Sequence, residues 1–174
     1  MLTTKRLIIP RRQMRVPIYA ALLALSQFSW GQSVNQAKAE SQELLNAALP
    51  FAEKMLSEHG AFYPYAYSMK LTGEIVSVAG YDGNDRPPSQ AIIDLLQSSF
   101  KAEARAGIVK ATAVVYDVWI TDSHTGKKTD AIAVALDHRD NYSVIIKFPY
   151  LLSAGKLTIG DPIAEAGSHS IFVR

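Results

Sequence analysis

Three stretches in the second half of the chain alternate bulky apolar residues with small or polar ones, which is the two-residue period of a strand. We expect strands at 108–121, 130–137 and 142–150, joined by the polar turns SHTGKK and HRDN into a meander. The bulky face of this meander must be covered. The opposite face, rich in alanine, either lets a helix pack closely or leaves a shallow surface for a partner, and we favour the helix.

The first half of the chain predicts a helix followed by a hairpin. Apolar residues recur every three or four positions over 36–59, and Pro50 within this stretch predicts a kink or the start of a second helix. Strands at 61–71 and 74–81 form a hairpin around the turn LTG. Because Pro64 cannot donate a backbone hydrogen bond, we expect the first of these strands at an edge of the sheet, or a bulge at this position.

A second helix, Ser89–Ala106 with Ser89 as its N-cap, links the hairpin to the meander. The predicted fold is therefore α+β, a five-stranded antiparallel sheet in α-ββ-α-βββ order with helices packed on it. We expect the first strand beside the last, and in the tail only a short strand at 156–160. This order resembles roadblock/longin-like and profilin-like domains over about residues 36–150, a likeness of topology that implies no functional residue.

The N-terminus has the order of a secretory signal. An apolar run, Val16–Phe28, follows five basic residues and precedes the small residues Ser29 and Gly31. We interpret residues 1–31 as a signal peptide, with Met14 as an alternative start, and 32–174 as a single periplasmic or secreted domain. The alternative is an uncleaved anchor, which would be the chain's contact with the membrane, although the run is shorter than the roughly 20 residues that span a bilayer.

Charge and composition exclude several functions. The formal net charge is +2, but the five basic residues of 1–31 account for it, and the remainder holds 13 basic against 16 acidic residues. The body of the protein therefore lacks the basic excess of a nucleic-acid-binding domain. The absence of cysteine excludes disulfides, thiolate metal sites and a cysteine nucleophile.

The chain contains none of the motifs that would identify a nucleophile elbow, a zinc site or a nucleotide-binding loop. We therefore assign no catalytic residue, metal ligand or cofactor. Four residues could form a polar site: Asp82, Asp117, Asp137 and His138. Asp82 opens a turn-rich loop, His138 begins the turn HRDN, and Asp117 interrupts an apolar strand, so it needs a wet face, an edge or a partner.

Aromatic residues provide the most distinctive candidate surface. Tyr63, Tyr65 and Tyr67 alternate along one predicted strand, and Trp119 lies in the meander. Tyrosine and tryptophan are enriched at protein interfaces, and they are also common in cores with their polar tips reaching water. Both roles fit these four residues.

The segments GAFYPYAYSM, VAGYDG, VYDV and DAIAVALDHRDNYSVIIKFPY resemble a family of small, uncharacterised bacterial α/β proteins, over about residues 50–172. The resemblance implies no activity and no site residue. We expect a non-catalytic periplasmic or secreted domain that binds a protein partner through an aromatic face or a strand edge, as toxin-neutralising immunity proteins do. The alternatives are a small hydrolase or ligand-binding enzyme that uses the aspartates, and a homodimer built by edge pairing.

Overall fold

The computed structural model describes residues 25–84, 86–121 and 126–173. The chain divides into two units, residues 1–32 and 33–174, and the described part of the first unit, 25–32, is helical. Most of the predicted signal peptide, residues 1–24, lies outside the described residues. Within the described ranges, none of the helices combines the length and the apolar character that crossing a bilayer requires.

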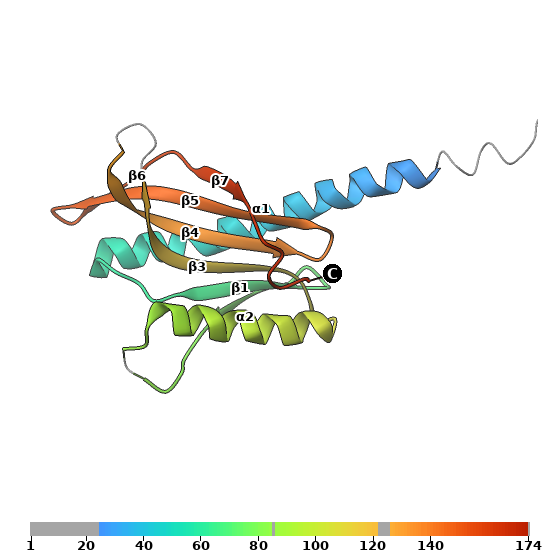
Figure 1. Ribbon diagram of the computed structural model, residues 1–174, viewed down its shortest axis with the longest axis horizontal. Helices are drawn as coiled ribbons and strands as arrows, with labels where there is room; N and C mark the ends of the chain where they lie inside the picture. The colour runs from blue at the N-terminus through green and yellow to red at the C-terminus, as the bar shows by residue number, and fades with distance from the viewer. Residues whose placement is uncertain (1–24, 85, 122–125, 174) are drawn as a thin grey trace, which may run out of the picture. The chain divides into compact units, whose positions relative to one another are not determined.

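The order of elements is α-ββ-α-βββ, as predicted, followed by two short strands (Figure 1). The first helix begins earlier than expected, and Pro50 does not end it. The elements are α1 (Leu25–His59), β1 (Tyr65–Lys70), β2 (Ile75–Ala79), α2 (Ser89–Arg105), β3 (Val109–Thr121), β4 (Lys128–His138), β5 (Tyr142–Ser153), β6 (Lys156–Ile159) and β7 (Ile163–Ala166).

The strands form one antiparallel sheet in the order β2-β1-β3-β4-β5-β6, and β7 pairs with β5. The α+β class and the antiparallel sheet are confirmed, but the sheet is larger than the five strands predicted. The expected neighbour of β1 was wrong, because β1 pairs with the first strand of the meander, β3, and not with the last. The chain passes through α2 from one side of β1 to the other, so the connection skips a single strand.

Helix boundaries follow local chemistry. Gly60 follows α1 with a φ of 74°, a conformation that glycine adopts without a steric penalty, and its N–H bonds the carbonyl of Leu56. The predicted N-cap of α2 was wrong by one position. Pro88 is the N-cap, it makes no side-chain cap bond, and Ser89 is the first helical residue.

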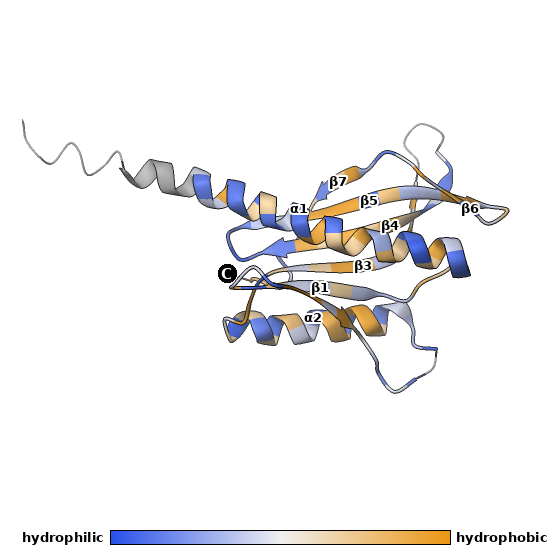
Figure 2. Cartoon of the chain, turned by 180° about the vertical axis from the view of Figure 1, so that it is seen from behind, coloured by the Kyte–Doolittle hydropathy of each residue, from blue (hydrophilic) through white to orange (hydrophobic). Residues whose placement is uncertain are grey.

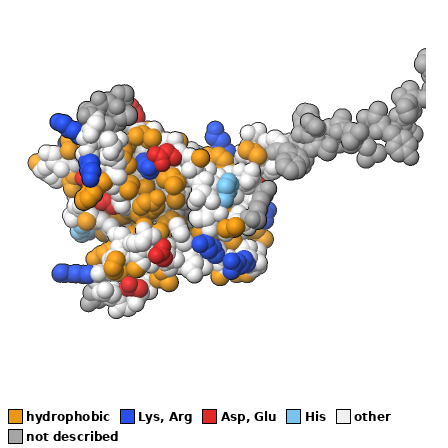
Figure 3. Space-filling view, in the orientation of Figure 1, with side chains coloured by type: hydrophobic (Ala, Val, Ile, Leu, Met, Phe, Trp, Pro, Cys, Tyr) orange, Lys and Arg blue, Asp and Glu red, His pale blue; other side chains and the backbone are white. Residues whose placement is uncertain are grey.

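The helices cover opposite faces of the sheet. The stripe of α1 packs on the bulky face, where it forms the larger core (Figure 2). Helix α2 packs mainly on β3 and β1, where Ile92, Leu96 and Phe100 form a second core with Ala66 and Val114. The alanine-rich face of β4 is therefore not explained by close packing of α2, and hydrophobic side chains are visible on this side of the molecule (Figure 3).

Candidate functional site

The three tyrosines of the predicted aromatic face have different environments. Tyr65 is 6 % exposed and belongs to the α1-side core. Tyr67 is half-buried against the same core, and Tyr63 precedes β1 and is exposed. These residues therefore do not form one continuous surface, and Tyr63 is the most accessible of them.

The hydroxyl of Tyr65 lies inside the hydrogen-bond ladder of α1. It donates to the carbonyl of Ala48 at 2.7 Å and accepts from the N–H of Ala52 at 3.0 Å. Ala48 and Ala52 are the i and i+4 positions that would bond each other in a regular helix, and Pro50 lies between them. Burial raises the pKa of Tyr65, so the phenol stays protonated and can serve both neighbours.

Trp119 lies on a stretch of β3 that is paired on one side only. The β1–β3 register ends at the pair Tyr65–Val115, while β3 continues along β4 as far as Thr121. β1 begins at Tyr65, so its pairing with β3 does not extend beyond this residue. Among the described residues, 116–121 therefore have β4 as their only strand partner, and we call this stretch the open β3 edge.

The side chain of Trp119 is 73 % exposed, and the ammonium group of Lys128 lies 5.8 Å from its ring centroid. A cation at this distance is attracted by the ring. Val118 and Ile120 point to the opposite, α2-side face and are half-buried. The open β3 edge therefore carries apolar side chains on both faces.

Asp117 lies on the open β3 edge, which agrees with one of the environments that the sequence required for it. Its carboxylate accepts a hydrogen bond from the Tyr150 hydroxyl at 3.1 Å. Burial raises the pKa of Asp117, the Tyr150 bond opposes that shift, and the charge of Asp130 adds to it.

The four residues of the predicted polar site are not brought together. Asp82 lies in the loop after β2, where its carboxylate accepts the N–H of Asn84 at 3.0 Å. Asp137 and His138 are consecutive in β4 and point to opposite faces of the sheet. Asp117 shares a face with His138 but lies six register positions away, which is about 20 Å along a strand.

His138 belongs instead to an ionic cluster that the sequence analysis missed. Glu40 of α1 accepts hydrogen bonds from Lys110 at 2.7 Å and, through its other oxygen, contacts Nε2 of His138 at 2.8 Å. The Nδ1 atom of His138 accepts the N–H of Asp140, so the neutral ring carries its proton on Nε2 and donates to Glu40. His138 is 1 % exposed, so a substrate would not reach it here.

Burial opposes ionisation of Glu40, but the bonds from Lys110, Gln36 and His138 outweigh it and lower the pKa of Glu40 to about 2. The cluster joins α1 to the beginning of β3 and the end of β4. A sequence signal did exist, because Glu40 falls one turn before Leu44, at a spacing that continues the apolar stripe.

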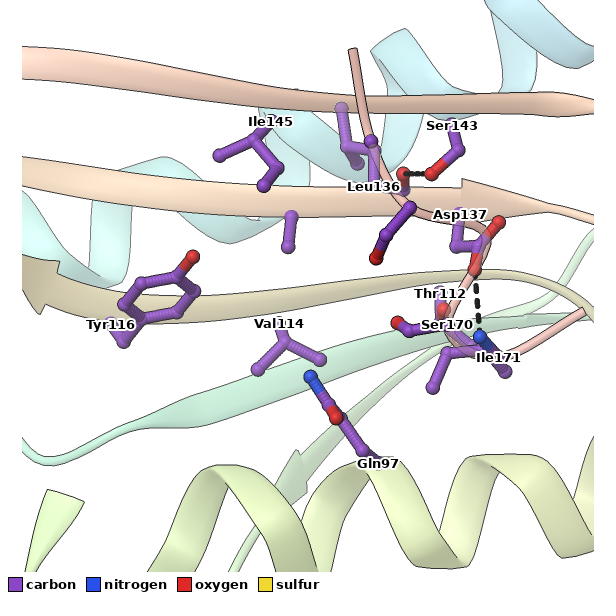
Figure 4. A pocket seen from close by; sticks show the side chains of 13 residues that line it. Gln97, Thr112, Val114, Tyr116, Leu136, Asp137, Ser143, Ile145, Ser170 and Ile171 are labelled. Atoms are coloured by element: carbon purple, nitrogen blue, oxygen red, sulfur yellow. Dashed lines mark hydrogen bonds between the residues drawn. The ribbon is translucent and has the colours of Figure 1, made fainter. Parts of the chain in front are cut away.

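A cavity of about 220 Å³ lies on the α2 side of the sheet (Figure 4). It lies beneath the segment that follows β7, here called the C-terminal segment (residues 167–173). Ser143 anchors this segment through its carbonyl to the N–H of Gly167 and through its hydroxyl to the N–H of His169. The lining is mixed, with polar side chains from α2, three strands and the segment itself: Gln97, Thr112, Tyr116, Asp137, Ser143, Ser168 and Ser170.

Two polar atoms of the lining residues are buried without a hydrogen-bond partner: Oγ1 of Thr112 and Oδ1 of Asp137. The second oxygen of Asp137 accepts the N–H of Ile171 at 2.8 Å. Burial raises the pKa of Asp137, and the N–H groups of Ile171 and Phe172 partly oppose that shift. Thr112 was missed in the sequence, although a polar residue within the apolar run of β3 is a usable signal.

The described residues hold no group of three or more side chains of the types that ligate metals. Comparison of the chain with family models, with curated proteins and with solved structures gives no match. The resemblance to a bacterial α/β family therefore stays a prediction, and the function has to be argued from the open β3 edge and the cavity.

Proposed function

We propose that this chain is a non-catalytic binding domain of the periplasm or the extracellular space, and that it binds an extended segment of a protein partner along the open β3 edge. The observation that carries this proposal is the end of the β1–β3 register at Val115, which leaves 116–121 paired with β4 alone beside the exposed Trp119.

Unpaired strand edges present backbone N–H and C=O groups that a partner strand can satisfy. In this mode of recognition the main-chain bonds supply affinity, and alternate side chains supply specificity. Here a bound strand would meet Trp119 on one face and Val118 and Ile120 on the other. Tryptophan in such a position is a common centre of binding energy at interfaces.

The distribution of ionisable groups supports a binding role over catalysis. A general acid–base pair needs two groups within hydrogen-bond reach of one reacting atom. Asp137 and His138 face opposite sides of the sheet, and the His138 ring is held by Glu40 and the Asp140 N–H. Asp117 accepts a hydrogen bond from Tyr150 and lies six register positions away from His138.

Trp119→Ala tests the proposal directly. The wild-type chain, the variant and a matched control, Tyr81→Ala, are immobilised and used to recover partners from a cell-envelope extract. Tyr81 is 70 % exposed and lies outside the sheet. Tyr81→Ala therefore removes a similar exposed aromatic side chain away from the open β3 edge. We expect a partner that the wild type and Tyr81→Ala retain and that Trp119→Ala loses.

Hydrogen exchange of the complex with the recovered partner then locates the contact. We expect added protection of the backbone amides of 116–121. Protection elsewhere, or equal recovery by Trp119→Ala, would contradict strand addition at this edge. Light scattering of the isolated chain identifies the competing outcome, in which two copies pair through the same edge and Trp119→Ala dissociates a dimer.

A further inference from the structure

We propose that the cavity beneath the C-terminal segment is a binding site for a small organic amine. The ammonium group of the ligand contacts the Asp137 carboxylate, and a second, uncharged polar group of the ligand lies near Thr112. This site lies on the α2 side of the sheet and is argued from other observations than the proposed strand addition, although Tyr116 belongs to both the cavity lining and the open β3 edge. The Asp137 and Thr112 side chains come from neighbouring strands, where these residues are a register pair.

Two buried atoms have no hydrogen-bond partner within the protein, although Oδ1 of Asp137 has a longer ionic contact with His169. Asp137 is 4 % exposed and Thr112 is 1 % exposed, yet Oδ1 of the first and Oγ1 of the second make no hydrogen bond. A buried polar group without a partner costs free energy, and a carboxylate costs more than a hydroxyl. A ligand that donates to Asp137 and exchanges a hydrogen bond with Thr112 would remove both penalties.

The charge of the lining selects a cation. Asp137 is the one carboxylate that lines the cavity among the described residues, and no lysine, arginine or histidine side chain lines it there. Nζ of Lys147 is held by Glu165 at 2.7 Å. A ligand carboxylate would therefore meet no positive group, which favours a simple amine over an amino acid.

His169 is the protein side chain that could neutralise the Asp137 carboxylate in place of a ligand. Its Nδ1 lies 3.6 Å from Oδ1 of Asp137, which is longer than a hydrogen bond. His169 is also 39 % exposed at its side chain, so water solvates it. An ammonium group inside the cavity could approach Oδ1 more closely than this ring does.

The size of the cavity limits the ligand to a few heavy atoms. Its 220 Å³ is the space of about seven water molecules at roughly 30 Å³ each. The other lining groups, the Gln97 amide and the hydroxyls of Tyr116 and Ser170, can bond a hydroxyl on the ligand. An amino alcohol combines both features.

Calorimetric titration with ethanolamine at neutral pH tests the site, with ethylene glycol and glycolate as neutral and anionic probes of similar size. We expect saturable binding of ethanolamine in the millimolar range or tighter, and no binding of the other two. Amide NMR shifts should move at Thr112, Asp137 and Ile171. Binding of ethylene glycol as tight as that of ethanolamine would overturn the proposal.

Asp137→Asn and Thr112→Val identify the contacts. Each substitution should raise the dissociation constant of ethanolamine by about tenfold or more, which is the effect of losing one hydrogen bond to a charged or buried group. Asp161→Asn and Thr158→Val make the same chemical changes at exposed positions and should leave binding unchanged. Asp137→Asn also changes the group that accepts the Ile171 N–H, so it could loosen the C-terminal segment. Thr112→Val removes a hydroxyl that has no hydrogen bond in the protein, so it tests the site separately.

Three outcomes would overturn the site: no binding of ethanolamine, binding that both cavity variants retain, or a crystal structure grown with ethanolamine in which the cavity holds water only.

Discussion

At the scale of single residues, the Tyr65 hydroxyl connects β1 to α1. Near Pro50 of α1, a phenol from β1 donates to the carbonyl of Ala48 and accepts the N–H of Ala52. The same side chain packs edge-on against Phe51, with ring centroids 4.8 Å apart. Tyr65 therefore binds the hairpin to α1 by a polar and an apolar contact at once.

Tyr65→Phe keeps the ring and removes the oxygen. We expect the free energy of unfolding to fall by about 1–3 kcal/mol, because a buried carbonyl and a buried N–H lose their shared partner. Urea denaturation followed by circular dichroism measures the change. Tyr63→Phe, at an exposed position, is the matched control and should be neutral; an equally neutral Tyr65→Phe would mean that α1 closes its own ladder without the phenol.

At the scale of elements, the Glu40 cluster determines how α1 is attached to the sheet. Glu40 contacts Lys110 at the start of β3 and His138 at the end of β4. Both contacts lie near the middle of α1, while the apolar stripe continues toward His59. The helix is therefore held by ionic contacts at one end of the packed stretch and by apolar contacts along the rest.

Glu40→Gln should destabilise the fold by about 2–3 kcal/mol at neutral pH. This lies below the roughly 3–5 kcal/mol for an uncompensated buried charge, because Lys110 keeps 11 % of its side chain exposed. The matched control is Glu43→Gln, at an exposed position of the same helix.

The effect of Glu40 also depends on pH in a defined direction. Since folding lowers the pKa of Glu40 from 4.5 to about 2, its contribution is fully present above pH 4.5 and is lost as the pH falls through 2. The difference in stability between wild type and Glu40→Gln should therefore shrink across this range. A difference that stays constant from neutral pH to pH 2 would contradict the ionic role.

The periodicity of apolar residues predicts where helices and strands lie and which faces are buried, but not which strands are neighbours. The second helix and the first five strands have clear local patterns and lie close to their predicted ranges, whereas α1 ends where predicted but begins eleven residues earlier. The β1–β3 pairing has no such signal, because alternation defines faces and not neighbours. β7 is short and exposed at all four positions, so it has no alternation to detect.

The candidate sites were less predictable for a related reason. Trp119 and Asp137 were singled out by residue type, but the open β3 edge depends on where the pairing of β3 with a strand distant in sequence, β1, ends. Thr112 and the C-terminal segment are far apart in sequence, and both line the cavity together with residues of β4 and β5.

At the scale of the whole molecule, the sheet has one face that α1 covers and one that α2 covers in part. The C-terminal segment extends the cover on the second face: Ile171 is buried in the α2-side core, and Ser143 holds the beginning of the segment against β5. A Cβ atom on Gly167 would lie 2.9 Å from the backbone of Ser143 and Val144, so only glycine fits there without movement.

Gly167→Ala should push the C-terminal segment away from β5. We expect a loss of about 1–3 kcal/mol from overpacking, together with faster amide exchange at Ile171. Gly160→Ala is the matched control, since a Cβ there would meet its nearest atom at 3.4 Å. Unchanged exchange at Ile171 would show that the segment absorbs the extra methyl group elsewhere.

The pairing of β1 with β3 also divides the chain in a way that can be exploited. The β1–β2 hairpin and the β3–β4–β5 meander each form through neighbours in sequence, whereas Tyr65 and Val115 meet across a long separation. A break in the loop between β2 and α2 would leave two halves with their own local pairings. Such halves should reassemble when mixed, which would make this small domain a natural candidate for a split reporter.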